Sequence, residues 1–122
     1  MRGGGSSTYP LEDFAAELQD AEANRNIGTT LWFENEHVRV WEVRLEPGQR
    51  APFHNHSQTY FWTCIDAGKG FQRFQDGTAE AFDFALGETV FHEIDQADPM
   101  IHDLENTDGH LLRFVAIELK DL

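Results

Sequence analysis

The sequence predicts one all-β domain, a jelly-roll barrel with a short helix near its N-terminus. Short runs rich in Val, Ile, Phe, Trp and Thr recur from residue 29 onward, and turn-forming residues separate them at regular intervals. Only one segment has the apolar spacing of a helix. The length of 122 residues suits a single domain. Many short strands in a chain of this size are typical of a sandwich or barrel, and a jelly roll is the natural closure.

Residues 1–28 are expected to form an N-terminal arm and a short helix. Residues 1–7 are rich in Gly and Ser, which predicts a mobile segment. The helix is expected over residues 10–23, because Pro10 suits a first helical turn and an apolar stripe repeats at i, i+3, i+4 and i+7. The stripe consists of Leu11, Phe14, Ala15 and Leu18. We expect it to pack on the outside of a sheet or on a partner subunit.

Residues 29–122 are expected to form the β domain. The expected strands cover residues 30–33, 38–45, 49–54, 60–65, 70–75, 79–84, 89–93, 100–104 and 111–119. The clearest turn signal is Asp76-Gly77, which lies between two alternating runs and predicts a β-hairpin.

The composition excludes several classes of partner. A formal net charge of −13 opposes binding to the phosphate backbone of nucleic acids, which depends on clustered Lys and Arg. No run approaches the ~20 apolar residues of a membrane span, and the N-terminus lacks the apolar stretch of a secretory signal. The single cysteine, Cys64, excludes an intramolecular disulfide and suits a reducing compartment. We therefore expect a cytoplasmic protein without nucleic-acid or membrane partners.

Two histidines one residue apart are the strongest functional signal in the chain. Side chains at i and i+2 share a face of an extended segment, so His54 and His56 can bind one metal ion from the same side. His102 lies in a later strand-like run, and an antiparallel barrel could bring it opposite this pair. Three imidazoles suit a divalent first-row metal ion, with Fe, Zn, Ni and Mn as candidates. The alternative is a set of barrel-lining histidines that only form hydrogen bonds.

The histidines stand at the spacing of two motifs of a known superfamily. Matches to the first motif are Gly48, His54, His56 and Gly68, and matches to the ends of the second are Gly87, His102 and Asn106. Over residues 29–119 the chain therefore resembles the cupin superfamily of small double-stranded β-helix proteins. The resemblance implies an RmlC-like cupin jelly roll with a metal ion at the histidines.

The chain departs from the cupin pattern at the glutamate that usually completes the metal site. Phe61 occupies that position, or Tyr60 at the shorter spacing of the motif. Phe61 cannot bind a metal, and the phenol of Tyr60 is a poor ligand because its ordinary pKa is about 10. The resemblance then implies a three-histidine centre with open positions. Thiol dioxygenases and diketone-cleaving dioxygenases of the superfamily bind iron in this way.

Tyr60 and His92 are the candidate catalytic residues. A phenol near a metal ion can position or protonate a bound substrate, whereas the alternative for Tyr60 is ordinary packing. His92 either faces the interior as an extra ligand or general base, or lies at the rim. Arg50 and Arg73 either bind a substrate carboxylate or form surface ion pairs with the abundant acidic residues.

These features favour a metal-binding protein that acts on a small molecule. Iron would favour a dioxygenase, an oxidoreductase, while zinc or nickel would favour lyase, isomerase or hydrolase chemistry. The alternative is a non-catalytic cupin that binds a small metabolite or has a regulatory or structural role. We also expect a homodimer, because open sheet edges with apolar side chains require cover.

Overall fold

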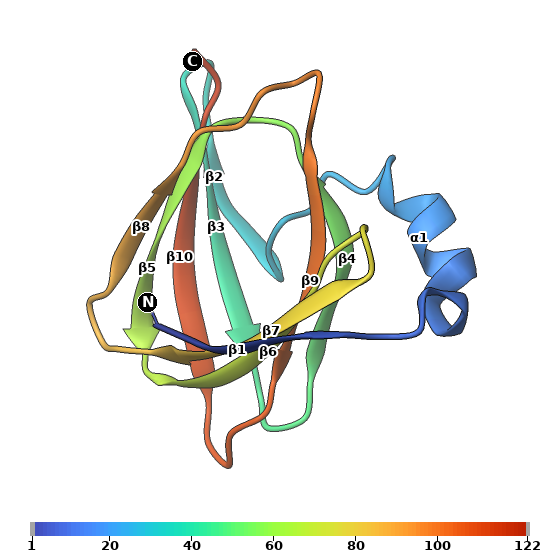
Figure 1. Ribbon diagram of the computed structural model, residues 1–122. Helices are drawn as coiled ribbons and strands as arrows, with labels where there is room; N and C mark the ends of the chain where they lie inside the picture. Colours follow the sequence, from blue (N-terminus) through green and yellow to red (C-terminus); the bar gives the residue numbers. More distant parts are fainter. Residues whose placement is uncertain (1, 122) are drawn as a thin grey trace.

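Two antiparallel sheets of five strands each make up most of the computed structural model, which describes residues 2–121 (Figure 1). Sheet A contains, in spatial order, β1 (Arg2–Thr8), β7 (Thr78–Phe84), β6 (Gly68–Arg73), β9 (Met100–Asn106) and β4 (Arg50–His56). Sheet B contains β2 (Thr30–Glu34), β3 (Val38–Leu45), β10 (Leu112–Leu119), β5 (Tyr60–Asp66) and β8 (Thr89–His92). The all-β fold class predicted from the sequence is confirmed.

The main hydrophobic core lies between the two sheets. On β10, the alternate residues Leu112, Phe114 and Ala116 are buried while their neighbours are only partly so, which is the period of two expected for a strand with one core face. The core cluster combines Val43, Leu45, Cys64, Leu112 and Phe114 of sheet B with Ala51, Phe82, Phe84 and Leu104 of sheet A. Its aromatic side chains therefore form the walls of the space between the sheets.

The predicted helix is present and covers the outer face of sheet A (Figure 1). It begins with a 3₁₀ turn, η1 (Leu11–Phe14), and continues as α1 (Ala15–Ala21), which contacts β4. A second hydrophobic cluster forms there from buried Ala21, Phe53 and Ile101, with Tyr9, Phe14 and Leu18 packed against them. Strands β4 and β9 are thus covered on both faces. No helix among residues 2–121 is long and apolar enough to cross a membrane.

The N-terminal segment differs from the mobile arm expected from its composition. Residues Arg2–Thr8 form β1, which pairs antiparallel with β7 at the edge of sheet A. The next residue is anchored twice, because the Tyr9 amide donates to the Gly77 carbonyl and the Tyr9 hydroxyl donates to the Phe74 carbonyl at 2.6 Å. Backbone pairing with the open edge of β7 outweighs the low strand propensity of Gly and Ser.

The predicted hairpin and most predicted strands are confirmed, with small shifts at their ends. The Asp76-Gly77 turn joins β6 to β7, and Gly77 has a φ of +90°, which glycine adopts readily. The most consequential shift concerns β4, which continues to His56 instead of ending at residue 54. Both histidines of the His-x-His pair therefore belong to one strand.

Large apolar side chains are exposed on the outer strands of sheet B. β2 exposes Leu31, Trp32 and Phe33, and β8 exposes Phe91. β2 pairs only with β3 among the described strands, so its other edge is open. The homodimer expected from the sequence stays a prediction, and these side chains are the ones that an edge-strand interface would bury.

Candidate metal centre and its cavity

The three predicted metal ligands come together on the inner face of sheet A. His54 and His56 lie on β4, His102 lies on β9, and the antiparallel pairing places His54 directly opposite His102. All three side chains are buried, with exposed fractions of 3%, 3% and 8%. Because β4 and β9 are neighbours in the sheet, residues almost fifty positions apart in the chain share one small site.

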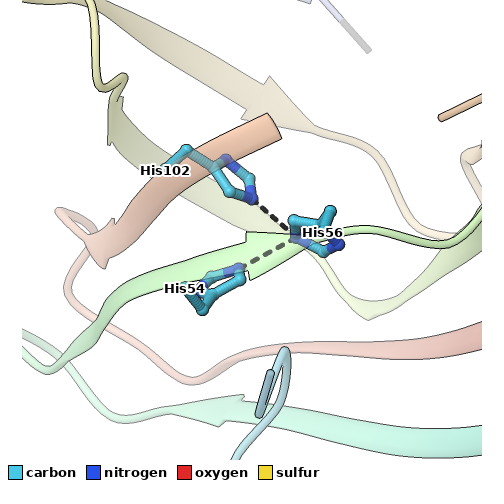
Figure 2. Close-up of side chains that lie close together, drawn as sticks. All are labelled: His54, His56 and His102. Atoms are coloured by element: carbon cyan, nitrogen blue, oxygen red, sulfur yellow. Dashed lines mark hydrogen bonds between the residues drawn. The ribbon is translucent and has the colours of Figure 1, made fainter. Parts of the chain in front are cut away.

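The imidazole rings point toward one another, as Figure 2 shows. The Nε2 atom of His56 lies 2.9 Å from Nε2 of His54 and 2.9 Å from Nε2 of His102. One nitrogen from each ring can be chosen so that all three lie within 4.8 Å of one another. Among residues 2–121, no carboxylate or thiol joins this group.

Hydrogen bonds at the far side of two rings fix which nitrogen carries the proton. Nδ1 of His54 lies 2.7 Å from the Pro52 carbonyl oxygen, and Nδ1 of His102 lies 2.6 Å from Oε1 of Gln72. Both oxygens can only accept, so each Nδ1 donates its proton. The Nε2 atoms of His54 and His102 therefore present lone pairs to the centre of the cluster, which is the arrangement of a metal-ligating histidine.

His56 cannot satisfy the hydrogen-bonding needs of this cluster. Its Nδ1 is buried and has no hydrogen-bond partner among the described residues. If the proton of neutral His56 is on Nε2, the Nδ1 lone pair remains unpaired; if it is on Nδ1, three Nε2 lone pairs face one another. Both arrangements carry the cost of buried polar atoms without partners. A cation at the centre of the cluster would satisfy its unpaired Nε2 lone pairs.

Burial keeps the three imidazoles neutral. It lowers the pKa of His54 to about 4, with the hydrogen bond to Pro52 acting weakly in the opposite direction. Burial likewise lowers the pKa values of His56 and His102 well below the ordinary value, and the neighbouring histidines add to the effect. A buried imidazolium is costly in this setting. Neutral imidazoles are the form that binds metals.

The donor set fits a divalent metal ion. Metal–imidazole distances are about 2.0–2.1 Å, so two nitrogens at right angles around one ion lie about 3.0 Å apart. Two of the three Nε2 separations, those of His56 to His54 and to His102, are 2.9 Å and match that spacing. The three histidines are therefore positioned to hold a metal ion.

Tyr60 and His92 form a ring stack with one of these histidines. The Tyr60 ring lies 4.2 Å from the His56 ring and 4.9 Å from the His92 ring, nearly parallel to both. Burial, with a smaller contribution from Glu118, raises the pKa of Tyr60, so its phenol keeps its proton. Nε2 of His92 accepts a hydrogen bond from the Trp62 indole at 3.1 Å. His92 thus lies beside the three-histidine group without belonging to it.

A cavity of about 90 Å³ opens beside the three histidines. Its polar lining gathers at one end and comprises His54, His56, His102, Tyr60, Gln72 and His92. The remaining wall is apolar and comprises Ile27, Val43, Ala51, Trp62, Phe82, Phe84, Leu104, Phe114 and Ala116. Both candidate catalytic residues therefore face the same space as the candidate metal ligands.

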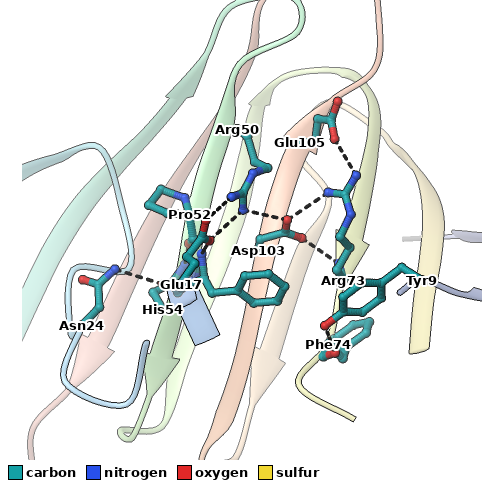
Figure 3. Close-up of polar contacts among 11 residues, drawn as sticks. Tyr9, Glu17, Asn24, Arg50, Pro52, His54, Arg73, Phe74, Asp103 and Glu105 are labelled. Atoms are coloured by element: carbon teal, nitrogen blue, oxygen red, sulfur yellow. Dashed lines mark hydrogen bonds and ion pairs between the residues drawn. The ribbon is translucent and has the colours of Figure 1, made fainter. Parts of the chain in front are cut away.

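The two arginines considered for substrate binding lie on the opposite face of sheet A (Figure 3). Arg50 and Arg73 each donate to Oδ2 of Asp103 at 2.9 Å, and Asp103 is fully buried. Arg50 also pairs with Glu17 of α1, and Arg73 pairs with Glu105 at 2.9 Å. The sequence left two roles open for these arginines, binding of a substrate carboxylate and ion pairing with acidic residues. In the structure both form ion pairs.

Several residues at or near the site could not be recognised from the sequence. Gln72 and Trp62 orient His102 and His92 from neighbouring strands, and no motif marks them. Glu118 faces inward beside Tyr60 and accepts from the Trp41 indole at 2.8 Å. By contrast, the motif residue Asn106 does not approach the histidines; its amide donates to the Leu45 carbonyl and anchors the loop after β9.

No family model and no curated protein matches this chain, but many solved structures do. A cupin domain from Bordetella pertussis is 25% identical, with a TM-score of 0.66 over 75% of this chain and 90% of that one. An RmlC-like cupin family protein with a double-stranded β-helix fold from Methanocaldococcus jannaschii is 16% identical, with a TM-score of 0.55 over 76% and 91%. The DMSP lyase DddQ from Ruegeria pomeroyi is 17% identical, with a TM-score of 0.52 over 72% of this chain and 41% of that one.

Proposed function

This chain has the cupin fold, the RmlC-like double-stranded β-helix, and from that premise we propose that it is a small-molecule enzyme with a three-histidine metal centre. One observation carries the proposal. The Nε2 atoms of His54, His56 and His102 converge in a buried site that holds more lone pairs than protons. Such a cluster is costly without a cation, and it lies at the polar end of a cavity.

A bound divalent ion would act there as a Lewis acid or, if it is iron, would support dioxygen chemistry. The surrounding residues suit complementary tasks. The protonated phenol of Tyr60 can donate a hydrogen bond to a substrate in the cavity, and His92 can exchange a proton with it. Trp62 holds the His92 ring in place, and Gln72 holds the proton of His102 on Nδ1.

Two reaction classes are consistent with this arrangement, and the metal decides between them. Three neutral imidazoles around iron would favour a dioxygenase reaction, whereas zinc or nickel would favour lyase or isomerase chemistry. The DMSP lyase among the similar structures has the same fold, which supports the fold's capacity for lyase chemistry.

Metal analysis of the purified protein tests the proposal. Protein prepared without chelators or metal-affinity resin is expected to contain close to one equivalent of a first-row metal by plasma mass spectrometry. His56→Ala is expected to lose it. His110→Ala is the matched control, because His110 is exposed and remote from the cluster, and it should retain the metal.

The outcomes separate the alternatives. Unchanged metal content in His56→Ala, or wild-type protein that takes up no metal when each ion is added anaerobically, would refute the metal centre. A stoichiometric metal with no oxygen uptake and no turnover across small-molecule panels would instead favour a non-catalytic cupin that binds a metabolite.

A further inference from the structure

We infer that the cavity binds a small ligand with a single anionic head group and an apolar body, an inference that rests on the proposed metal centre. The cavity volume of about 90 Å³ is several times the roughly 10–15 Å³ of such space that one water molecule needs, so a small organic ligand fits. The polar groups of the lining all gather around the histidines, and the remaining wall is aromatic and aliphatic. A ligand must therefore place its polar head at the histidines and its apolar part against Phe82, Phe84 and Phe114.

The charge of the site determines the kind of head group. Among the described residues, no Asp, Glu, Lys or Arg lines the cavity. The three imidazoles are neutral, so they would leave both positive charges of a bound divalent ion uncompensated in a buried space. An unpaired buried charge is expensive. An anionic oxygen or sulfur on the ligand neutralises one of these charges, whereas a neutral head group neutralises neither.

One inward-facing carboxylate lies close by but is already paired. Glu118 is opposite Tyr60 across the β10–β5 ladder and is 2% exposed. Its Oε1 accepts from the Trp41 indole at 2.8 Å and from the Arg39 guanidinium at 3.2 Å. Glu118 therefore does not supply the missing negative charge at the histidines.

The absence of Lys and Arg from the described cavity lining limits the ligand to one anionic group. A second anionic group at the apolar end of the ligand would need a cationic partner there, and Arg50 and Arg73 lie on the other face of sheet A in ion pairs. The apolar wall would instead desolvate that second charge. Short-chain carboxylates, thiolates and enolates with one charge match the cavity best.

Three ligands of nearly equal shape test the inference by calorimetry. Isobutyrate, isobutyramide and isobutyramidinium differ mainly in charge, which is negative, neutral and positive. They are titrated into protein whose zinc content has been measured as one equivalent. We expect isobutyrate to bind at least tenfold more tightly than isobutyramide, no binding of isobutyramidinium, and no binding of isobutyrate to zinc-free protein. Equal affinity for the first two, or no isobutyrate binding to the loaded protein, would overturn the inference.

An isosteric substitution provides the second test. Gln72→Glu places a carboxylate at the cavity wall and keeps an acceptor for Nδ1 of His102. Zinc content is expected to stay at one equivalent, while the affinity for isobutyrate falls about tenfold. Gln75→Glu is the control, since Gln75 is exposed and contacts the Pro99 carbonyl, and it should leave that affinity unchanged. Unchanged affinity in Gln72→Glu would overturn the inference, whereas absence of zinc from the wild type would refute the metal centre itself.

Discussion

Strands β4 and β9 carry a polar cluster on each face of sheet A, and the two clusters differ in completeness. The outer cluster joins Asp103 to Arg50 and Arg73, with Glu17 and Glu105 as further partners (Figure 3). Every charge in it faces an opposite charge. The inner cluster of His54, His56 and His102 has no charged member and leaves a buried nitrogen without a partner. A polar network whose members all have protein partners stabilises the fold. A buried polar network beside a cavity that leaves an atom without a partner indicates a ligand site.

The outer cluster should show the larger effect on stability when it is broken. Asp103→Ala removes a buried acceptor that two half-buried guanidinium groups and the backbone amide of Arg73 share. We expect the free energy of unfolding to fall by about 3 kcal/mol in urea denaturation, because removing one partner strands the others. Glu46→Ala is the control, since its ion pair with Arg44 is exposed, and it should cost at most about 1 kcal/mol. Equal costs for the two variants would contradict the contrast drawn between the clusters.

The inner cluster should make the metal-free protein sensitive to acid. His54 has a pKa of about 4 when folded and an ordinary value of about 6.5 when unfolded, so between these values only the unfolded chain binds the proton. Its contribution to stability is therefore complete above pH 6.5 and is lost as the pH falls toward 4. Between pH 8 and pH 5 the loss for His54 alone is about 2 kcal/mol. Urea denaturation of chelator-treated protein at both pH values measures it, and His54→Gln should reduce the loss.

Removal of one histidine from the inner cluster should raise the free energy of unfolding, whereas removal of Asp103 from the outer cluster should lower it. In metal-free protein, His56→Leu replaces a buried polar ring whose Nδ1 lacks a partner with an apolar side chain, so we expect the free energy of unfolding to rise by about 1 kcal/mol. The same variant should bind no metal. His110→Leu, at an exposed position, should change neither property. A marked destabilisation by His56→Leu would indicate that the three histidines are a structural network.

The smallest effect is expected for one hydroxyl at the cavity. Tyr60→Phe keeps the ring that stacks on His56 and removes only the phenolic group. We expect unchanged metal content and an isobutyrate affinity about fivefold weaker, the size of one lost hydrogen bond. Calorimetry measures the affinity, with Phe91→Leu on the exposed surface as the control. If both metal content and affinity stay at the wild-type level, Tyr60 is a packing residue.

The convergence of the three histidines could be predicted from the spacing of the His-x-His pair and from a motif. The His-x-His pair shares a strand face by the period of two, and His102 follows from the resemblance to a known motif. Tyr60 was also marked by that motif, as the residue near the missing glutamate. The structure places its ring against His56, while Phe61 is absent from the cavity lining.

Other features depend on contacts between strands that no local pattern records. Gln72 reaches His102 because β6 and β9 are neighbours in sheet A, and Trp62 reaches His92 across the β5–β8 pair. The face occupied by Arg50 and Arg73 depends on the register of β4 and β6. The sequence did not predict β1, because Gly and Ser have low strand propensity. The segment forms a strand by pairing with the edge of β7.

The position of β4 at the edge of sheet A determines how the site would exchange its ion. Among the described strands, β4 pairs only with β9. The residues after α1 secure its other side, because the Asn55 amide donates to the Asn24 carbonyl and the Asn24 side chain donates to the Phe53 carbonyl. Loss of these contacts together with the pairing of residues 54–56 with β9 would expose His54 and His56 while the strands of sheet B stay paired. Metal exchange should therefore proceed at the rate of this local opening. Amide hydrogen exchange in residues 53–56 should occur at the same rate.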